Sequence, residues 1–96
     1  MTEVLVHCKP GCKYCDLAEN FLKSIFVPYT KVIYYPDDPD YSTRQSLLFE
    51  VNDHASFPQI LVGTKFVGGY RELLKAYESS VLEKLLNDIG LQLLDF

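Results

Sequence analysis

The chain has 96 residues, of which 48 % are apolar and 23 % are charged, and its net charge at pH 7 is −4. This composition excludes a disordered or fibrous protein, and the negative charge argues against nucleic-acid binding through phosphate contacts. The apolar runs are far shorter than the ~20 residues that span a bilayer, so we expect no membrane contact. Glu3 stands where a signal peptide needs basic residues. We therefore expect one soluble cytoplasmic domain over residues 1–96.

The first half of the chain predicts two strands and two helices. A β-branched run over 3–8 predicts a buried strand, which Pro10 and Gly11 end. A helix that stops at Pro28 follows, because apolar residues recur at three- and four-residue steps: Leu17, Ala18, Phe21, Leu22 and Ile25. A second strand is expected over 29–35. A second helix is expected over 41–51, marked by Leu47, Leu48 and Val51.

The second half predicts a hairpin and two more helices. Two apolar runs within 57–67 flank a glycine-containing turn, which is typical of a β-hairpin. An apolar stripe over 73–77 begins a third helix. Residues 80–83 (SVLE) fit a capping box, so a new helix should start there and end near Gly90. The tail over 91–96 is apolar enough to pack back on the domain.

The predicted order of elements is β-α-β-α-β-β-α-α. A β-α-β start needs a parallel strand pair joined by a crossover helix, and the hairpin adds antiparallel strands. The simplest assembly is an α/β fold of three layers, with a mixed four-stranded sheet between helices.

Three cysteines fall within eight residues, and two of them form a C-x-x-C motif: Cys8, Cys12 and Cys15. The motif lies where a turn passes into the first predicted helix. Residues i and i+3 at a helix start share one face, close enough for a disulfide. Helix-terminal amides and the lysines at 9 and 13 favour a thiolate at Cys12. Cys12 is therefore the expected nucleophile, and Cys15 the resolving thiol.

Two other interpretations of the cysteines remain open. Zinc sites also use C-x-x-C, but they need a second ligand pair, and only His7, Cys8 and the distant His54 are left. An unreactive thiol pair is the other alternative. Cys8 itself is expected to be a small buried hydrophobic residue, with a secondary redox site as the alternative.

Three segments together resemble the glutaredoxin family, the glutathione-dependent branch of the thioredoxin fold. Residues 9–15 (KPGCKYC) resemble K-x-x-C-P-Y-C, and residues 56–60 (SFPQI) resemble T-V-P-Q-I. Residues 66–73 (FVGGYREL) resemble the segment G-G-x-[ST]-D-[LF]. The resemblance covers nearly the whole chain. It implies a thioredoxin-like α/β/α sandwich, a redox-active cysteine pair and a cis peptide bond before Pro58.

The resemblance also implies functional residues. The catalytic residues would be Cys12, Cys15 and Lys9. The residues that would bind glutathione are Lys9, Tyr14, Gln45, Phe57, Pro58, Gly69, Tyr70, Arg71 and Glu72. A cis proline frees the backbone of the residue before it to pair with a peptide, and adjacent glycines let a ligand approach a helix start closely. Gln45 is placed only by counting back thirteen residues from Pro58.

The chain departs from the family pattern at three places, one of which, Phe57 in place of valine, keeps the backbone role and enlarges the rim of the groove. Lys13 replaces a proline, which frees a backbone amide and adds a positive charge. Arg71-Glu72 replaces Ser/Thr-Asp, so the carboxylate that should meet the ammonium group of glutathione is one methylene longer.

We therefore expect a monomeric, glutathione-dependent thiol–disulfide oxidoreductase that reduces protein disulfides and glutathione mixed disulfides. Glutathione is its reducing co-substrate, and no metal is expected. A second interpretation is a thioredoxin-like donor, for example to ribonucleotide reductase, that a flavoprotein reductase recharges. A third is an iron–sulfur carrier that bridges a cluster between two chains, which the lysine at position 13 permits.

Overall fold

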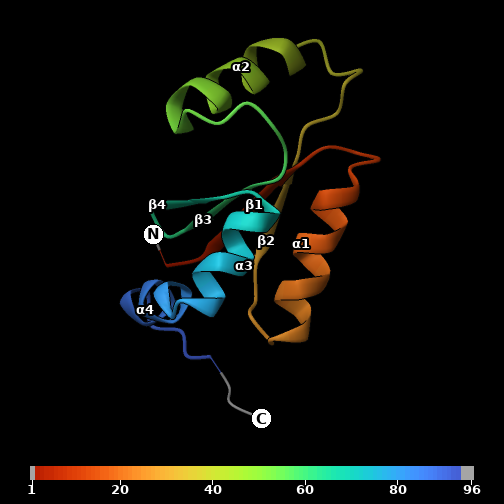
Figure 1. Cartoon of the computed structure of the whole chain (residues 1–96). Coiled ribbons are helices and arrows are strands. Elements are labelled where there is room, and N and C mark those ends of the chain that lie inside the picture. Colours follow the sequence, from red (N-terminus) through yellow and green to blue (C-terminus); the bar gives the residue numbers. More distant parts are fainter. Residues whose placement is uncertain (1, 94–96) are drawn as a thin grey trace.

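The computed structural model describes residues 2–93, and its elements follow the predicted order (Figure 1). The strands are β1 (Val4–Cys8), β2 (Thr30–Ile33), β3 (Gln59–Val62) and β4 (Lys65–Gly68). The helices are α1 (Lys13–Ser24), α2 (Tyr41–Asn52), α3 (Tyr70–Glu78) and α4 (Val81–Asp88). Both the number and the type of the elements expected from the sequence are confirmed for these residues.

The four strands form one mixed sheet in the order β2-β1-β3-β4. β1 is parallel to β2 and antiparallel to β3, and β4 pairs antiparallel with β3 as the second strand of the hairpin. Because β3 runs opposite to β1, the start of β3 lies at the end of β1. The segments before β3 and after β1 therefore meet at one edge of the sheet.

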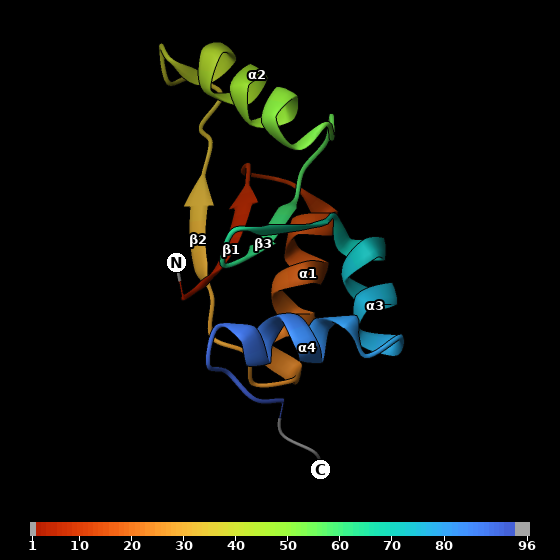
Figure 2. The ribbon, with the colours of Figure 1, turned by 90° about the vertical axis from the view of Figure 1, so that its left-hand side faces the viewer.

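The core lies between the sheet and the helices α1 and α3, which pack against each other (Figure 2). α1 contacts β1, α3 contacts β4, and α4 packs on α3. Several core side chains have no solvent exposure, and their burial contributes about 1.5–3 kcal/mol each: Val6, Leu22, Ile60, Leu73 and Leu86.

Helix α2 stands apart from this core. Both ribbon views place it beyond the ends of β1 and β2 (Figures 1 and 2). None of its side chains is fully buried, and Leu47 and Val51 are 57 % and 79 % exposed. Of the three apolar residues that mark this helix in the sequence, only Leu48 packs against the core. The predicted apolar stripe therefore faces the core only in part.

Several side-chain contacts join α2 to the rest of the molecule, and three of them involve the active-site edge of the sheet. The guanidinium of Arg44 lies 4.5 Å from the ring centroid of Tyr34. The ring of Phe49 packs at 5.3 Å against Phe57. At the end of the helix, Asn52 Nδ2 donates a 2.8 Å hydrogen bond to the side-chain oxygen of Gln59. All three partners lie near the edge of the sheet where β1 ends and β3 begins.

One predicted helix end and one predicted helix cap are wrong. α1 ends at Ser24, before Pro28, because Phe26 takes a left-handed φ of 58° and its amide bonds back to the carbonyl of Lys23. α4 does start after Ser80, but Ser80 has a φ of 66° and makes no side-chain cap, so the predicted capping box is absent.

The end of the chain agrees with the prediction as far as it is described. Gly90 follows α4 with a φ of 85°, and Leu91 and Leu93 pack against the core. The remainder of the predicted tail, 94–96, lies outside the described residues. Within residues 2–93, no helix has the length and apolar character needed to cross a membrane.

Candidate active site

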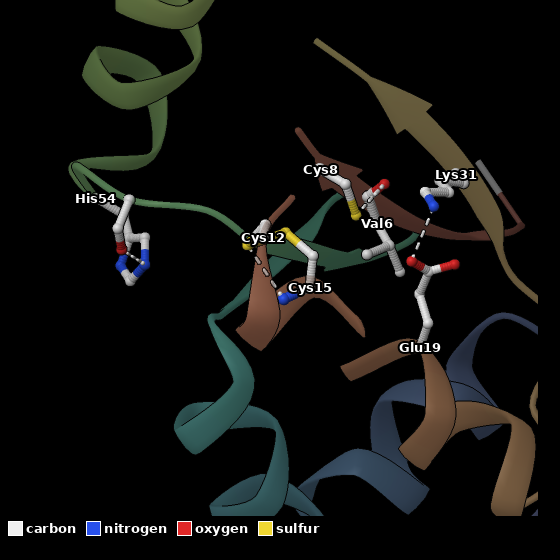
Figure 3. The surroundings of a disulfide bond; sticks show 8 residues. Val6, Cys8, Cys12, Cys15, Glu19, Lys31 and His54 are labelled. Carbon is white, nitrogen blue, oxygen red and sulfur yellow. Dashed lines mark hydrogen bonds and ion pairs between the residues drawn. A yellow bond between two sulfur atoms is a disulfide. The ribbon is translucent and has the colours of Figure 1, made fainter. Parts of the chain in front are cut away.

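The C-x-x-C motif lies at the start of α1, directly after a turn that begins at the end of β1 (Figure 3). Gly11 has a φ of 71°, a left-handed conformation that suits glycine and reverses the chain there. Cys12 is the N-cap of α1 in an extended conformation, and its sulfur accepts a 3.2 Å hydrogen bond from the amide of Cys15. The sequence therefore folds so that one sulfur caps the positive end of a helix, which favours its thiolate form.

Cys12 and Cys15 form a disulfide, with their Cα atoms 5.2 Å apart. The two cysteines differ in access to solvent. Cys12 is 9 % exposed, whereas Cys15 is 1 % exposed and faces the core. An attacking thiol must reach its substrate, and a resolving thiol needs only to reach its neighbour. This difference agrees with the expected attack by Cys12 and resolution by Cys15, and both roles stay predictions.

A cleft of about 300 Å³ opens beside the motif. It lies between the segment before β3 and the start of α3, and Tyr14, between the two cysteines in the sequence, is the residue of the motif that lines it. The peptide bond between Phe57 and Pro58 is cis, as expected. The cleft is lined by Tyr14, His54, Ser56, Phe57, Pro58, Gly69, Tyr70, Arg71 and Glu72.

The wall formed by the start of α3 depends on a close contact between its glycines and Glu72. The amide of Gly69 donates a 2.9 Å hydrogen bond to Glu72 Oε1, which caps the helix. Gly68 has a φ of 125°, and a Cβ atom there would lie 2.7 Å from Cβ and Cγ of Glu72. No larger residue fits at Gly68 without moving this carboxylate. On the outer side of the cleft the rings of Tyr14 and Tyr70 lie 6.2 Å apart.

Seven of the nine residues predicted to bind glutathione line this cleft, and two do not. Lys9 lines a separate cavity of about 220 Å³ together with Lys31 and Tyr35. Gln45 is half-buried on α2 and is not among the residues lining the cleft. The glutathione-binding roles stay predictions for all nine residues.

Sequence reasoning missed two residues of the cleft, His54 and Ser56. His54 was considered only as a distant zinc ligand. Ser56 opens the segment 56–60 that resembles a family motif, whereas the signal for His54 is its position just before that segment. In the structure His54 Nε2 lies 3.1 Å from Ser56 Oγ, and the imidazole packs at 5.5 Å on the ring of Phe66.

Cys8 is buried, as the sequence predicted. Its side chain is 0 % exposed, and its thiol lies 3.8 Å from the carbonyl oxygen of Val6. Burial, with a smaller contribution from the carboxylate of Glu19, raises the pKa of the Cys8 thiol to about 11. Cys8 is thus held as a neutral thiol away from the cleft.

An ion pair between the buried carboxylate of Glu19 and the exposed ammonium group of Lys31 joins α1 to β2. Glu19 is 8 % exposed, and its carboxylate lies 3.0 Å from Lys31 Nζ (Figure 3). The carboxylate also accepts a 2.9 Å hydrogen bond from the hydroxyl of Tyr29. Burial and this hydrogen bond raise the pKa of Tyr29 to about 12. The ammonium group of Lys31 and the hydroxyl of Tyr29 thus provide the charge partner and the hydrogen bond that a buried carboxylate requires.

A second, half-buried pair joins β1 to the residue after β2. The hydroxyl of Tyr34 is 2.9 Å from His7 Nδ1. Burial and the nearby charge of Arg44 lower the pKa of His7. This histidine is therefore neutral in the folded protein at neutral pH. Among residues 2–93, no group of three or more His, Cys, Asp or Glu side chains is placed to hold a metal ion.

Comparisons with known proteins identify the family. No family model matches the chain. The chain is 33 % identical over 90 residues to glutaredoxin-1 of Saccharomyces cerevisiae, in an alignment that covers 91 % of this chain and 82 % of the relative. The crystal structure of oxidised glutaredoxin 2 from Chlamydomonas reinhardtii matches with a TM-score of 0.78 and 32 % identity, over 92 % of this chain and 82 % of that one. The chain belongs to the glutaredoxin family.

A third match concerns the fold. The buckwheat glutaredoxin–glutathione complex superposes with a TM-score of 0.83 at 19 % identity, over 94 % of this chain and 81 % of that chain. The thioredoxin-like α/β sandwich is therefore confirmed. Family membership and the Cys12–Cys15 pair make the protein a thiol–disulfide oxidoreductase.

Proposed function

We propose that this oxidoreductase uses glutathione as its reductant and acts on protein disulfides and on protein–glutathione mixed disulfides. The observation that carries the proposal is the Cys12–Cys15 disulfide beside a cleft of about 300 Å³ that is walled by Tyr14, Pro58 and Gly69. A similarly folded buckwheat glutaredoxin is described as a glutathione complex. Because glutathione keeps thiols reduced in the cytosol, we place the protein in the cytoplasm.

Reduction of a protein disulfide would use both cysteines. The thiolate of Cys12 attacks one sulfur of the substrate, which forms a mixed disulfide and releases the other substrate sulfur as a thiolate that takes up a proton. Cys15, deprotonated, then attacks the sulfur of Cys12 and releases the second substrate thiol. The protein is left with the Cys12–Cys15 disulfide. Two molecules of glutathione return it to the dithiol and become one molecule of glutathione disulfide.

Reduction of a glutathione mixed disulfide needs only Cys12. Its thiolate attacks the glutathione sulfur and releases the substrate protein as a thiol. A second glutathione then attacks the adduct, which frees Cys12 and forms glutathione disulfide. The buried position of Cys15 is compatible with this route because Cys15 takes no part in it.

The test measures glutathione-dependent reduction of a glutathionylated peptide and of a protein disulfide. Wild type should reduce both, and Cys12→Ser should reduce neither. Cys15→Ser should keep activity on the glutathionylated peptide and lose activity on the protein disulfide. Cys8→Ser serves as the matched control and should resemble wild type. Robust activity in Cys12→Ser would rule the proposal out.

A thioredoxin-like donor remains the second candidate because of Glu72. Its carboxylate already accepts the amide of Gly69, so the contact expected with the ammonium group of glutathione competes with helix capping. Supplying electrons through glutathione and glutathione reductase, or through thioredoxin reductase, separates the candidates. The proposal requires faster turnover with glutathione, and faster turnover with thioredoxin reductase favours the donor.

A further inference from the structure

The strand β2 forms an open edge of the sheet. Figure 2 shows it as the outermost strand, and β1 is its only neighbour in the sheet formed by residues 2–93. The amide of Tyr34 donates a 2.8 Å hydrogen bond to the carbonyl oxygen of Cys8 at the end of β1. In a parallel pair, every second residue directs its N–H and C=O groups to the same neighbour. Val32 and Tyr34 therefore face β1, whereas Lys31 and Ile33 direct their N–H and C=O groups away from the sheet.

A cavity of about 220 Å³ lies beside this edge and reaches the turn that leads into α1. From the strand and the residue two positions after it, the cavity is lined by Lys31, Ile33 and Tyr35. From the turn, it is lined by Lys9 and Pro10. The side chains of alternate strand residues share one face of the sheet. The residues with outward-directed backbone groups are therefore the same ones that line the cavity.

The charged groups that line the cavity are both ammonium groups. The charge of Lys31 is matched by Glu19, whereas Lys9 makes no ion pair among residues 2–93. Ile33 and the half-exposed ring of Tyr35 add apolar surface. The cavity therefore suits a carboxylate side chain that is accompanied by apolar groups. The chain that carries this side chain would find hydrogen-bonding groups along the strand edge.

The position of this edge fits the polypeptide part of a disulfide substrate. Neighbouring strands lie about 4.8 Å apart, so a strand added to β2 would lie about 10 Å from β1, whose end leads into the Cys12 turn. Three or four extended residues, at about 3.3 Å each, span that distance. The cleft beside Pro58 lies toward β3, on the other side of β1. The cleft and the β2 edge are thus two separate surfaces next to one reactive sulfur.

We propose that the free edge of β2 binds the polypeptide of a protein substrate as an additional antiparallel strand, with a carboxylate side chain in the cavity beside Lys9. This inference rests on the proposed function, in which Cys12 attacks the substrate. The added strand accepts hydrogen bonds from the N–H groups of Lys31 and Ile33 and donates to their carbonyl oxygens. Side chains opposite these two residues lie on the cavity face. The preferred substrate is therefore an extended segment with alternating acidic and apolar residues, three or four positions from its reactive cysteine.

The direct test is hydrogen exchange of a trapped complex, followed by NMR. A peptide with an N-terminal cysteine, three linking residues and four alternating glutamates and valines is activated as a mixed disulfide with thionitrobenzoate. The thiolate of Cys12 in Cys15→Ser attacks the peptide sulfur, and the peptide stays attached through a disulfide while thionitrobenzoate leaves as a coloured thiolate. The reference complex carries glutathione, attached to Cys12 from the same kind of reagent.

The exchange rates of the β2 amides give the decisive readout. The amides of Lys31 and Ile33 should exchange roughly tenfold more slowly in the peptide complex than in the glutathione complex, which is the factor that one net hydrogen bond supplies. The amide of Val32 is the internal control, because it already faces β1, and its exchange should be the same in both complexes.

Two variants at one position, made in the Cys15→Ser protein, separate the strand backbone from the side chain. Ile33→Pro removes an outward N–H without removing a hydrogen bond to β1, whereas Ile33→Ala keeps the N–H and shortens the side chain. The peptide reagent should release thionitrobenzoate roughly tenfold more slowly with Ile33→Pro than with Ile33→Ala. The glutathione reagent should release it at the same rate with both variants.

The charge of the peptide tests the role of Lys9. A peptide with lysines in place of the glutamates should react roughly fivefold more slowly with Cys15→Ser, and Lys9→Gln, made in the same protein, should remove most of this difference. Because the ratio compares two peptides on one protein, any effect of Lys9 on the reactivity of Cys12 cancels. A ratio that Lys9→Gln leaves unchanged overturns the placement of the carboxylate.

Two exchange results overturn the inference. One is unchanged exchange at Lys31 and Ile33 in the peptide complex, which would leave β2 as a short edge strand whose lysine discourages pairing. The other is slower exchange throughout the sheet, which would indicate general stabilisation. If neither reagent releases thionitrobenzoate, attack by Cys12 fails and the proposed function fails with it. Release from both reagents without protection of β2 removes only the binding of polypeptide at this edge.

Discussion

Replacing Phe57 with valine tests how α2 is joined to the active-site edge. Phe57 is 9 % exposed, and its ring lies 5.3 Å from the rings of both Tyr34 and Phe49. The guanidinium of Arg44 in turn lies over the ring of Tyr34. The Phe57 ring thus joins the edge of the sheet to α2, a helix that has no fully buried side chain of its own.

The expected cost can be worked out from this packing. Truncating a buried phenylalanine to alanine costs about 3–5 kcal/mol, and valine fills part of the space, so Phe57→Val should lose roughly 2–3 kcal/mol of unfolding free energy. With a urea m-value of about 1 kcal/mol/M for a chain of this size, the midpoint should fall by about 2–3 M. In the variant, amide protons of α2 should exchange with solvent faster than they do in wild type, and the increase should be larger than for α1.

Urea unfolding and hydrogen exchange measure the two effects. Val51→Ala is the matched control, because Val51 is on α2 but 79 % exposed, and it should change stability by less than about 0.5 kcal/mol. A loss for Phe57→Val no larger than that of the control, or unchanged exchange in α2, would refute the reasoning.

Three further predictions follow from single contacts. Glu72→Ala should lower the free energy of unfolding in urea by about 1 kcal/mol, because the hydrogen bond that caps α3 at Gly69 is lost. Glu83→Ala, at the same position of α4, should lower it by only about 0.3 kcal/mol, and equal losses would contradict the cap. Cys8, with its pKa raised to about 11, should resist iodoacetamide at pH 8 in the folded, oxidised protein and should react once the protein is unfolded. Mass spectrometry measures this alkylation, and rapid reaction of the folded protein would contradict the burial of Cys8. Because the pKa of His7 is lowered on folding, the unfolded chain takes up a proton first, so stability should fall as the pH drops below about 6.5. A melting series from pH 7.5 to 5 should show this fall in wild type and a smaller one in His7→Gln, and identical slopes would contradict it.

The sequence predicted those parts of the fold that depend on short-range pattern. The glycine turn before Cys12, the hairpin within 57–67 and the cysteines at i and i+3 each have a local physical cause, and each is found in the structure. Local pattern misled where a long-range contact or backbone geometry decided the outcome. Ser80 has the right neighbour for a capping box, but its left-handed φ turns the side chain away from that role.

The cleft shows the same limit. The segments that contain Pro58 and Gly69 were predicted as parts of the site because they belong to segments that resemble family motifs. His54 was missed because nothing local marks a histidine two residues beyond the end of α2, and only the fold brings it to Gly69. Lys9 lies close to Cys12 in sequence, but the turn directs it into the cavity beside Lys31. The role of Lys9 at the site stays a prediction.

The measurement that tests the central claim most directly is mass spectrometry of Cys15→Ser after incubation with glutathione disulfide. The cap geometry of Cys12 predicts one glutathione per chain, attached at Cys12, and its release by added reduced glutathione. Cys15→Ser is used because it cannot resolve the adduct internally. The absence of an adduct, or an adduct located on Cys8, would contradict the account.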